Sequence, residues 1–385
     1  MTDSYNRCYQ CMHEIKIGTT ICPNCNYPIA KNLTCLNILK PGTILANRYI
    51  VGNVIEKNQE NITYIAFDKH LDVKVSVKEF FPMSLATRLN SKEVIPNDKD
   101  LELFNKINSE FISIFSVLSK FRTMPNILKI YSSFSENNTS YVIQEYPSGI
   151  TLRRYLSNNY GELSWSKSSS MFIELIKSMQ HLHNTGIIHC GLSPETILVE
   201  NEKLKIIGFS TIYLRTNTSA FPCELYDGYA APEQYENNYC GPWTDVYGIA
   251  AVMYKTLTGT MPIASNTRSS NDNLIAPDIL NSHVPKNVSL AIMSALTLSP
   301  KLRTQTLEDF YADTVTPLRS TQKQSIEFTN QNLKIESKDF YGTIPKKPEI
   351  KTSKLVFITM VVSTSIVMLS LAIIMFLLFG EHLFG

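Results

Sequence analysis

The chain has 385 residues, which is enough for one domain of roughly 250 residues with smaller modules beside it. Hydrophobic residues make up 44% and charged residues 18%, as expected for a globular protein that carries one long apolar segment. With 36 basic and 34 acidic residues the net charge is only +2, so we expect no nucleic-acid partner.

The N-terminal residues carry no apolar run that could direct secretion, but they hold two Cys-x-x-Cys pairs, Cys8 with Cys11 and Cys22 with Cys25. Four thiolates at this spacing can surround a Zn²⁺ ion tetrahedrally. Two disulfides or a redox pair are the alternatives, although a redox pair needs a βαβ framework for which there is no room. We therefore predict a structural zinc ribbon over residues 1–33 that folds only with its metal.

Residues 34–46 are expected to form a linker to a larger domain at residues 47–318. This domain begins with β-rich runs, such as residues 49–51 and 64–67, and then becomes helical in pattern. The order predicts an α+β architecture in which a small sheet lobe precedes a helical lobe.

Six short motifs follow one another along this domain. They are VSVKEFFP (residues 75–82), YVIQEY (141–146), IIHCGLSPETIL (187–198), IIGFS (206–210), APE (231–233) and GPWTDVY (241–247). In this order they resemble the signatures of protein kinases, in particular the bacterial, eukaryotic-like serine/threonine protein kinases that carry an N-terminal zinc ribbon. The resemblance covers about the first 318 residues and implies a bilobal protein-kinase-like fold.

The resemblance also implies a nucleotide site between the lobes. Lys78 matches the ATP-binding lysine, and Glu145, Tyr146 and Pro147 match the hinge whose backbone holds adenine. The glutamate that normally pairs with this lysine is replaced by Ile114, while Glu110 lies one turn earlier on the same helix face. Without such a partner, Lys78 is expected either to pair near Glu79 or to face solvent.

The positions that carry the chemistry depart from the family pattern. Gly191 stands where the catalytic aspartate belongs, and Gly208 and Thr196 replace the two metal ligands. Residues 56–61 contain none of the glycines that would cradle phosphates, and Glu56 and Glu60 bring negative charge there instead. We expect no intact catalytic residue.

The positions that carry the architecture are retained. By resemblance, His189 and Phe209 stack between the lobes with Leu118 above them, and Asp245 anchors the catalytic-loop backbone. Glu233 and Arg303 match a buried ion pair at the end of the activation segment.

The C-terminal part contains residues 319–354, a polar, lysine-bearing stretch expected to be a tether, and residues 355–379, which carry no charge. A helix of 25 such residues can cross a bilayer. Lysines precede the segment, so the positive-inside rule predicts a single-pass protein of the cell membrane with cytoplasmic N-terminal domains and a short extracytoplasmic tail, residues 380–385.

The favoured hypothesis is a catalytically inactive, membrane-anchored scaffold or allosteric partner of other proteins, such as an active kinase or a cell-envelope complex. One alternative is a divergent active serine/threonine kinase in which Glu195 or Glu200 holds the metal. Another is a nucleotide sensor that binds ATP through Lys78 and the hinge without Mg²⁺.

Overall fold

The computed structural model of the chain describes residues 5–29, 37–217, 222–269 and 271–316. The predicted tether, membrane helix and tail, residues 319–354, 355–379 and 380–385, lie outside this part. Among the described residues, none forms a helix with both the length and the apolarity needed to span a bilayer.

The N-terminal module is a two-stranded antiparallel hairpin with a cysteine cluster at its end. Its strands are β1 (Tyr5–Arg7) and β2 (Glu14–Lys16), with Asn6 opposite Ile15. Cys8 and Cys22 are fully buried and pack with Ile15 in a small core of their own.

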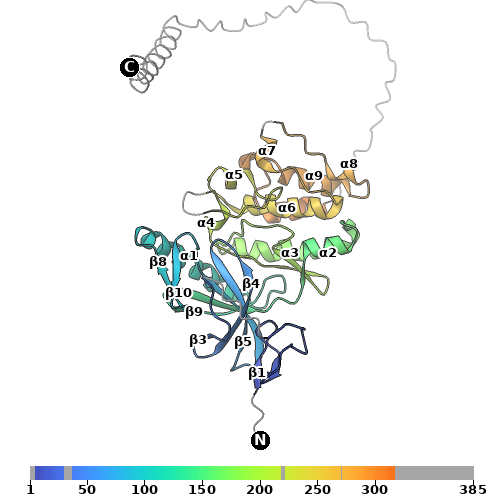
Figure 1. Ribbon diagram of the computed structural model, residues 1–385. Helices are drawn as coiled ribbons and strands as arrows, with labels where there is room; N and C mark the ends of the chain where they lie inside the picture. The colour runs from blue at the N-terminus through green and yellow to red at the C-terminus, as the bar shows by residue number, and fades with distance from the viewer. Residues whose placement is uncertain (1–4, 30–36, 218–221, 270, 317–385) are drawn as a thin grey trace, which may run out of the picture. The chain divides into compact units, whose positions relative to one another are not determined.

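A six-stranded antiparallel sheet forms the first lobe (Figure 1). The strand order is β3-β4-β5-β6-β10-β9. Its strands are β3 (Ile44–Leu45), β4 (Tyr49–Lys57), β5 (Asn61–Asp68), β6 (Val73–Phe80), β9 (Ile130–Glu136) and β10 (Thr139–Glu145). A separate hairpin of β7 (Ala86–Leu89) and β8 (Glu93–Pro96) follows β6.

Strand β5 is buried along its whole length because both faces of the sheet are covered there. Alternate residues point to opposite faces of a strand. Ile62, Tyr64 and Ala66 join the main core, whereas Ile65 and Phe67 pack with Met12 of the N-terminal module. The module is therefore part of the packing of this lobe.

One helix, α1 (Leu101–Leu118), covers the inner face of the sheet between the short turns η1 (Asp98–Asp100) and η2 (Ser119–Phe121). Its buried residues are apolar and recur every three or four positions: Phe104, Ile107, Phe111, Phe115 and Leu118. The ring of Phe80 on β6 lies 5.2 Å from that of Phe104 and 5.4 Å from that of Phe111.

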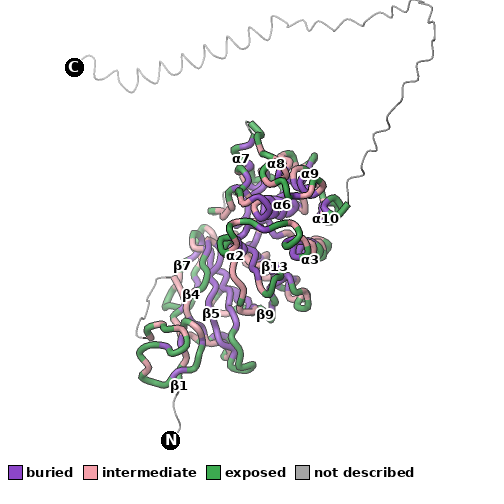
Figure 2. Tube along the Cα trace, turned by 90° about the vertical axis from the view of Figure 1, so that its right-hand side faces the viewer, coloured by how far each residue is buried: buried purple, intermediate pink, exposed green. Residues whose placement is uncertain are grey.

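The second lobe is helical around the buried helix α6 (Figure 2). Its helices are α2 (Leu152–Asn158), α3 (Trp165–His183), α4 (Ile212–Arg215), α5 (Pro232–Tyr235), α6 (Pro242–Thr258), α7 (Ser265–Arg268), α8 (Pro277–Leu280), α9 (Lys286–Ala295), η3 (Pro300–Leu302) and α10 (Leu307–Val315). A small sheet of β11 (Ile150–Thr151), β12 (Ile197–Glu200) and β13 (Lys203–Ile206) carries the cleft loops.

The segment expected to be a linker, residues 34–46, differs from that expectation where it is described. Ile44 and Leu45 pair with β4 at the edge of the sheet. Leu39 is fully buried, and its N–H donates to the hydroxyl of Tyr64 at 3.1 Å. A run of only two apolar residues, Ile44 and Leu45, is too short to predict a strand from the sequence. Their pairing with β4 and the burial of Leu39 depend on contacts with other parts of the chain.

Candidate functional site

The loop between α3 and β12, residues 187–196, reaches the cleft on an anchor provided by α6. Asp245 accepts hydrogen bonds from the backbone N–H groups of His189 at 2.8 Å and Cys190 at 2.7 Å. The ring of His189 meets that of Phe209 edge-on at 4.7 Å, and Leu118 is buried in the same core as Phe209. The predicted architectural residues thus connect the loop of residues 187–196 to α6 and to Phe209.

The two positions that replace metal ligands carry neither a carboxylate nor a carboxamide oxygen. Gly208 has no side chain and adopts φ +80°, a conformation that side chains rarely accept. Thr196 donates its hydroxyl proton to the carbonyl of Gly191 at 2.7 Å, and the hydroxyl accepts from the N–H of Ser193 at 2.9 Å. This hydroxyl is committed to the fold of its own loop.

Arg215 fills the space beside Gly191 where a catalytic aspartate would project. A Cβ at Gly191 would lie 2.5 Å from Nε and 2.7 Å from Cζ of Arg215. The guanidinium donates to the hydroxyl of Ser210 at 3.0 Å, the carbonyl of Gly208 at 3.0 Å and the carbonyl of Glu224 at 3.2 Å. A buried cation therefore takes the position of the proton acceptor.

Glu60, at the turn between β4 and β5, enters the cleft from the sheet lobe. Its carboxylate is fully buried and accepts hydrogen bonds from both the N–H and the hydroxyl of Thr211. The next residue back, Gln59, donates its N–H to the carboxylate of Glu224 at 2.9 Å. Burial raises the pKa of Glu60, against the hydrogen bonds from Thr211 and the charge of Lys78.

Lys78 lies inside the cleft with only 2% of its surface exposed, which differs from both the solvent-facing and the Glu79-paired expectations. Its ammonium donates to the carbonyl of Phe209 at 3.4 Å. Burial lowers its pKa, while the negative charges of Glu56 and Glu60 oppose that shift. Lys78, Arg215 and Glu60 thus form a buried charge cluster at the place where protein kinases hold phosphates.

The two glutamates considered near Lys78 have other partners. Glu110 accepts the N–H of Ile212, the first residue of α4, at 3.0 Å. Glu79 points to the other face of β6, where it pairs with Arg88 at 2.6 Å and accepts from the hydroxyls of Tyr64 and Tyr141. Neither supplies the usual partner of the lysine.

The hinge backbone is largely occupied by the protein itself. The carbonyl of Glu145 accepts the hydroxyl of Ser76 at 3.0 Å, and its N–H donates to the carbonyl of Lys129 at 2.8 Å. Pro147 has no N–H to offer. Of the three predicted hinge residues, only Tyr146 keeps an N–H without an assigned acceptor among the described residues.

The two carboxylates proposed to rescue metal binding both have cationic partners. Glu195 pairs with Arg153 at 2.7 Å on the surface. Glu200 pairs with Lys205 at 2.7 Å, and Lys205 also contacts the carboxylate of Glu145 at 3.2 Å.

The four predicted metal ligands do come together. The Sγ atoms of Cys8, Cys11, Cys22 and Cys25 lie within 4.8 Å of one another, and two of their separations are 3.7 Å. Sulfurs bound tetrahedrally to Zn²⁺ at about 2.3 Å would lie about 3.8 Å apart. The cluster can hold a metal ion, and its all-thiolate set suits zinc.

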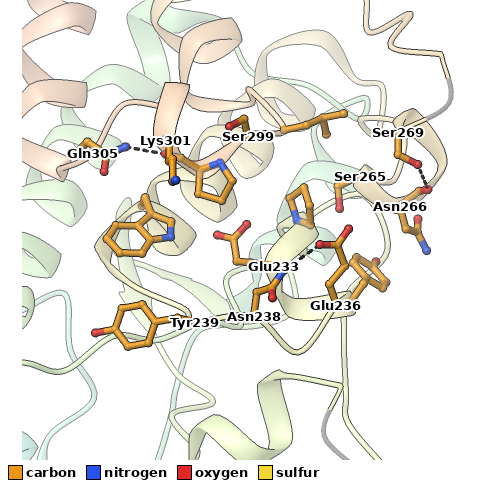
Figure 3. A pocket seen from close by; sticks show the side chains of 15 residues that line it. Glu233, Glu236, Asn238, Tyr239, Ser265, Asn266, Ser269, Ser299, Lys301 and Gln305 are labelled. Carbon is orange, nitrogen blue, oxygen red and sulfur yellow. Dashed lines mark hydrogen bonds between the residues drawn. The ribbon is translucent and has the colours of Figure 1, made fainter. Parts of the chain in front are cut away.

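Arg303 and Glu233 form the ion pair expected from the resemblance, with Nη1 to Oε1 at 2.7 Å and Nη2 to Oε2 at 3.0 Å. Beside it lies a cavity of about 680 Å³ between α5, α7 and η3 (Figure 3). Tyr239, Trp243 and Lys301 line this cavity, and the buried Nε1–H of Trp243 has no hydrogen-bond partner among the described residues. Its volume is within the range of ligand-binding pockets, and it is separate from the charged cleft.

The sequence predicted neither the position of Arg215 beside Gly191 nor the hydrogen bond from Ser76 to the hinge. Arg215 gives no local signal, since it is a single basic residue at the end of the segment Ile212–Arg215 and belongs to no recognised motif. It becomes meaningful only once Gly191 is known to lie beside it.

The chain is similar to known protein kinases over most of its described part. The family described as "Protein kinase domain" matches residues 88–334, a range that begins after Lys78. A probable serine/threonine-protein kinase of Clostridium acetobutylicum is 23% identical over 326 residues, 78% of this chain and 46% of the relative. Serine/threonine-protein kinase PrkC of Bacillus subtilis is 24% identical over 302 residues, 75% of this chain and 43% of the relative. The chain therefore spans less than half the length of these curated relatives.

A solved structure described as "PpkA-294 apo form" has the same fold. It aligns with a TM-score of 0.61 at 24% identity and covers 72% of this chain and 99% of its own.

Proposed function

We propose that this chain, which belongs to the protein kinase domain family and is similar to the bacterial, eukaryotic-like serine/threonine kinases, is a kinase-like protein without phosphoryl-transfer activity. It acts by binding other proteins, as a scaffold or as an allosteric partner. Residues 355–379 anchor it in the cell membrane with its folded part in the cytoplasm.

The observation that carries this proposal is the guanidinium of Arg215 against Gly191. A protein kinase needs a carboxylate there to orient the substrate hydroxyl and accept its proton. A cation that donates to Ser210 and to the carbonyls of Gly208 and Glu224 can accept no proton. Loss of one preorganised group of this kind commonly costs about 10²–10³ in rate.

The buried carboxylate of Glu60 supports the same conclusion. It supplies a negative charge close to Lys78 and Arg215, the two cations that would otherwise attract phosphate. A nucleotide would have to displace Glu60 from Thr211 before its phosphates reached these cations. The bonded hydroxyl of Thr196 and the bare Gly208 leave Mg²⁺ without its two usual protein ligands.

An active kinase fits the family comparisons equally well, since both relatives named above are described as kinases. A metal-free nucleotide sensor is the third candidate, and the buried Lys78 and the N–H of Tyr146 are the observations in its support. The three functions differ in how the protein responds to ATP and Mg²⁺.

The test combines phosphate transfer with thermal unfolding of the full chain in detergent. We expect no incorporation from labelled ATP above that of a Lys78→Ala control, and no change in Tm with ATP, with or without Mg²⁺. Incorporation that disappears in Lys78→Ala would overturn the proposal in favour of an active kinase. A rise in Tm with ATP alone would replace it with the sensor.

A further inference from the structure

The N-terminal module docks on the sheet through the segment that contains its first two cysteines. The carbonyl of Tyr9 accepts the backbone N–H of Asn53 at 2.8 Å, and the side-chain amides of Gln10 and Asn53 meet at 2.8 Å. Tyr9 and Gln10 both stand between Cys8 and Cys11. The residues between the first two predicted metal ligands therefore also form hydrogen bonds with the sheet.

An apolar contact accompanies these hydrogen bonds. Met12 is 3% exposed and packs with Ile65 and Phe67 on the outer face of β5, next to Tyr146 of the hinge. The guanidinium carbon of Arg7 lies 3.4 Å from the centre of the Phe67 ring. These contacts cover a face of the sheet that would otherwise expose two large apolar side chains.

The sheet is shaped to receive the module at Gly52. A Cβ there would lie 2.1 Å from Cε of Met12 and 2.4 Å from the carbonyl oxygen of Tyr9. The β4–β5 register shifts between Val51 and Val54, so β4 has an irregularity at this point. The shift leaves the N–H of Asn53 free to bond the module.

Metal coordination would fix the docking segment. The N–H of Met12 donates to the carbonyl of Cys8 at 2.7 Å, and Met12 has φ +62°, which is uncommon for a residue with a side chain. A module of this size has too small a core to keep such a loop without its metal. Loss of the metal would release Tyr9, Gln10 and Met12 from the sheet together.

The β4–β5 hairpin, which contacts the module near Gly52, carries Glu60 at its other end. Gly52 and Lys57, the last residue of β4, are five positions apart, about 17 Å along an extended strand. Beyond Lys57, Gln59 and Glu60 bond Glu224 and Thr211 across the cleft. The β4–β5 hairpin is therefore held by the cysteine module at its base and by the cleft at its tip.

We propose that the cysteine module is a metal-dependent clamp on the β4–β5 hairpin, and that metal occupancy controls how firmly Glu60 is seated against Thr211. This inference goes beyond the proposed function, because the clamp holds the hairpin whether or not the cleft transfers phosphate. The ligand is a thiophilic divalent cation with tetrahedral preference, for which Zn²⁺ is the probe.

Hydrogen exchange of the full chain in detergent, with Zn²⁺ bound and after chelation, tests the clamp. We expect chelation to speed exchange at the hairpin tip, residues 56–62, by about tenfold or more, while amides of α6 keep their protection. Unchanged exchange at the tip, or an equal increase in α6, would overturn the proposal.

Two variants separate the clamp from simple loss of the metal. Gly52→Ala, and the milder Met12→Ala, should still bind one Zn²⁺ per chain but exchange rapidly at the tip even when it is bound. Ile17→Ala is the matched control, since Ile17 belongs to the same module but is 67% exposed, and it should behave as the unmodified protein does. A Met12→Ala protein that keeps both its zinc and its protected tip would refute the coupling. Phosphate-transfer assays report on the proposed function separately.

Discussion

In the cleft, the side chain of Arg215 packs against the backbone of Gly191. A larger residue at position 191 would overlap the guanidinium in this position. Arg215 is 2% exposed and its guanidinium uses three acceptors, which leaves it little freedom to move. The missing side chain and the added cation are therefore two parts of one structural change, and they should be coupled energetically.

The Gly191→Ala variant tests this coupling. We expect it to lose about 1–3 kcal/mol of unfolding free energy, because the new methyl group overlaps the guanidinium. In an Arg215→Ala background the same substitution should cost less, with an interaction energy of about 0.5–3 kcal/mol. Urea denaturation of the four proteins measures the cycle, and strictly additive losses would show that the two residues do not compete for space.

His189 makes stability depend on pH. Its Nδ1 accepts the N–H of Gly191 at 3.1 Å and its Nε2–H donates to the carbonyl of Ile207 at 2.9 Å, so the folded protein holds the neutral ring. Burial lowers the pKa of His189 to about 4, although the charge of Asp245 opposes the shift. Between that value and the ordinary 6.5, the unfolded chain binds more protons at this residue than the folded chain.

Unfolding free energy should therefore fall as the pH drops from about 6.5 to about 4, with a contribution from His189 of up to about 3 kcal/mol. Urea titrations at several pH values measure the slope. His189→Asn should be less stable at pH 7 but should lack this part of the slope. An identical slope in the variant would assign the pH dependence to other groups.

One buried ion pair holds the short helix α5. Arg303 follows η3 and reaches Glu233 in α5 with both terminal nitrogens, and it also donates to the carbonyls of Thr297 and Leu298. Both charged side chains are almost completely buried, at 0% and 1% exposure. A charge left alone in such a place is costly.

We expect Arg303→Ala to reduce the unfolding free energy by about 3–5 kcal/mol, because it leaves the carboxylate of Glu233 buried without its partner. Arg153→Ala is the control, since its pair with Glu195 is exposed and should contribute about 0–1 kcal/mol. Thermal or urea unfolding of both variants gives the comparison. Equal losses would mean that burial does not set the value of these pairs.

The sequence predicted those elements whose motifs are local and missed those that depend on distant partners. The family, the order of the lobes and the four clustered cysteines follow from short patterns around Lys78, Asp245 and Cys8. The strand at Ile44 and the docking of Met12 do not, since each is stabilised by residues far along the chain. The sequence places the negative charge of Glu60 where a kinase would hold phosphates. Its hydrogen bond to Thr211 could not be predicted, because it joins residues 151 positions apart.

The sheet lobe and the helical lobe are connected across the cleft by hydrogen bonds between the protein's own residues. Gln59 and Glu60 from the sheet lobe bond Glu224 and Thr211 from the helical lobe, and Lys78 bonds Phe209. A working kinase uses nucleotide and metal to bring these regions together. Here side chains of the protein itself bridge the two lobes, which is consistent with the proposed binding of other proteins without ATP.

Residues 355–379 are expected to place the protein at the membrane. Residues 355–379 could extend about 37 Å as a helix, which exceeds the hydrocarbon thickness of about 30 Å, and they contain no charge. Lys346, Lys347, Lys351 and Lys354 precede them, whereas Glu381 is the only acidic residue after them. The excess of lysine favours a cytoplasmic position for the preceding residues.

We expect the full chain to stay in the membrane fraction through alkaline carbonate extraction, and a chain lacking residues 355–385 to become soluble with an unchanged Tm. Protease added to intact cells should leave the folded part uncut, because on this topology it faces the cytoplasm. As a control for orientation, replacing the four lysines by glutamine should weaken the topological bias without releasing the protein from the membrane. A full chain extracted by carbonate would show that the segment does not span the bilayer, and the partners would then have to be sought among soluble proteins.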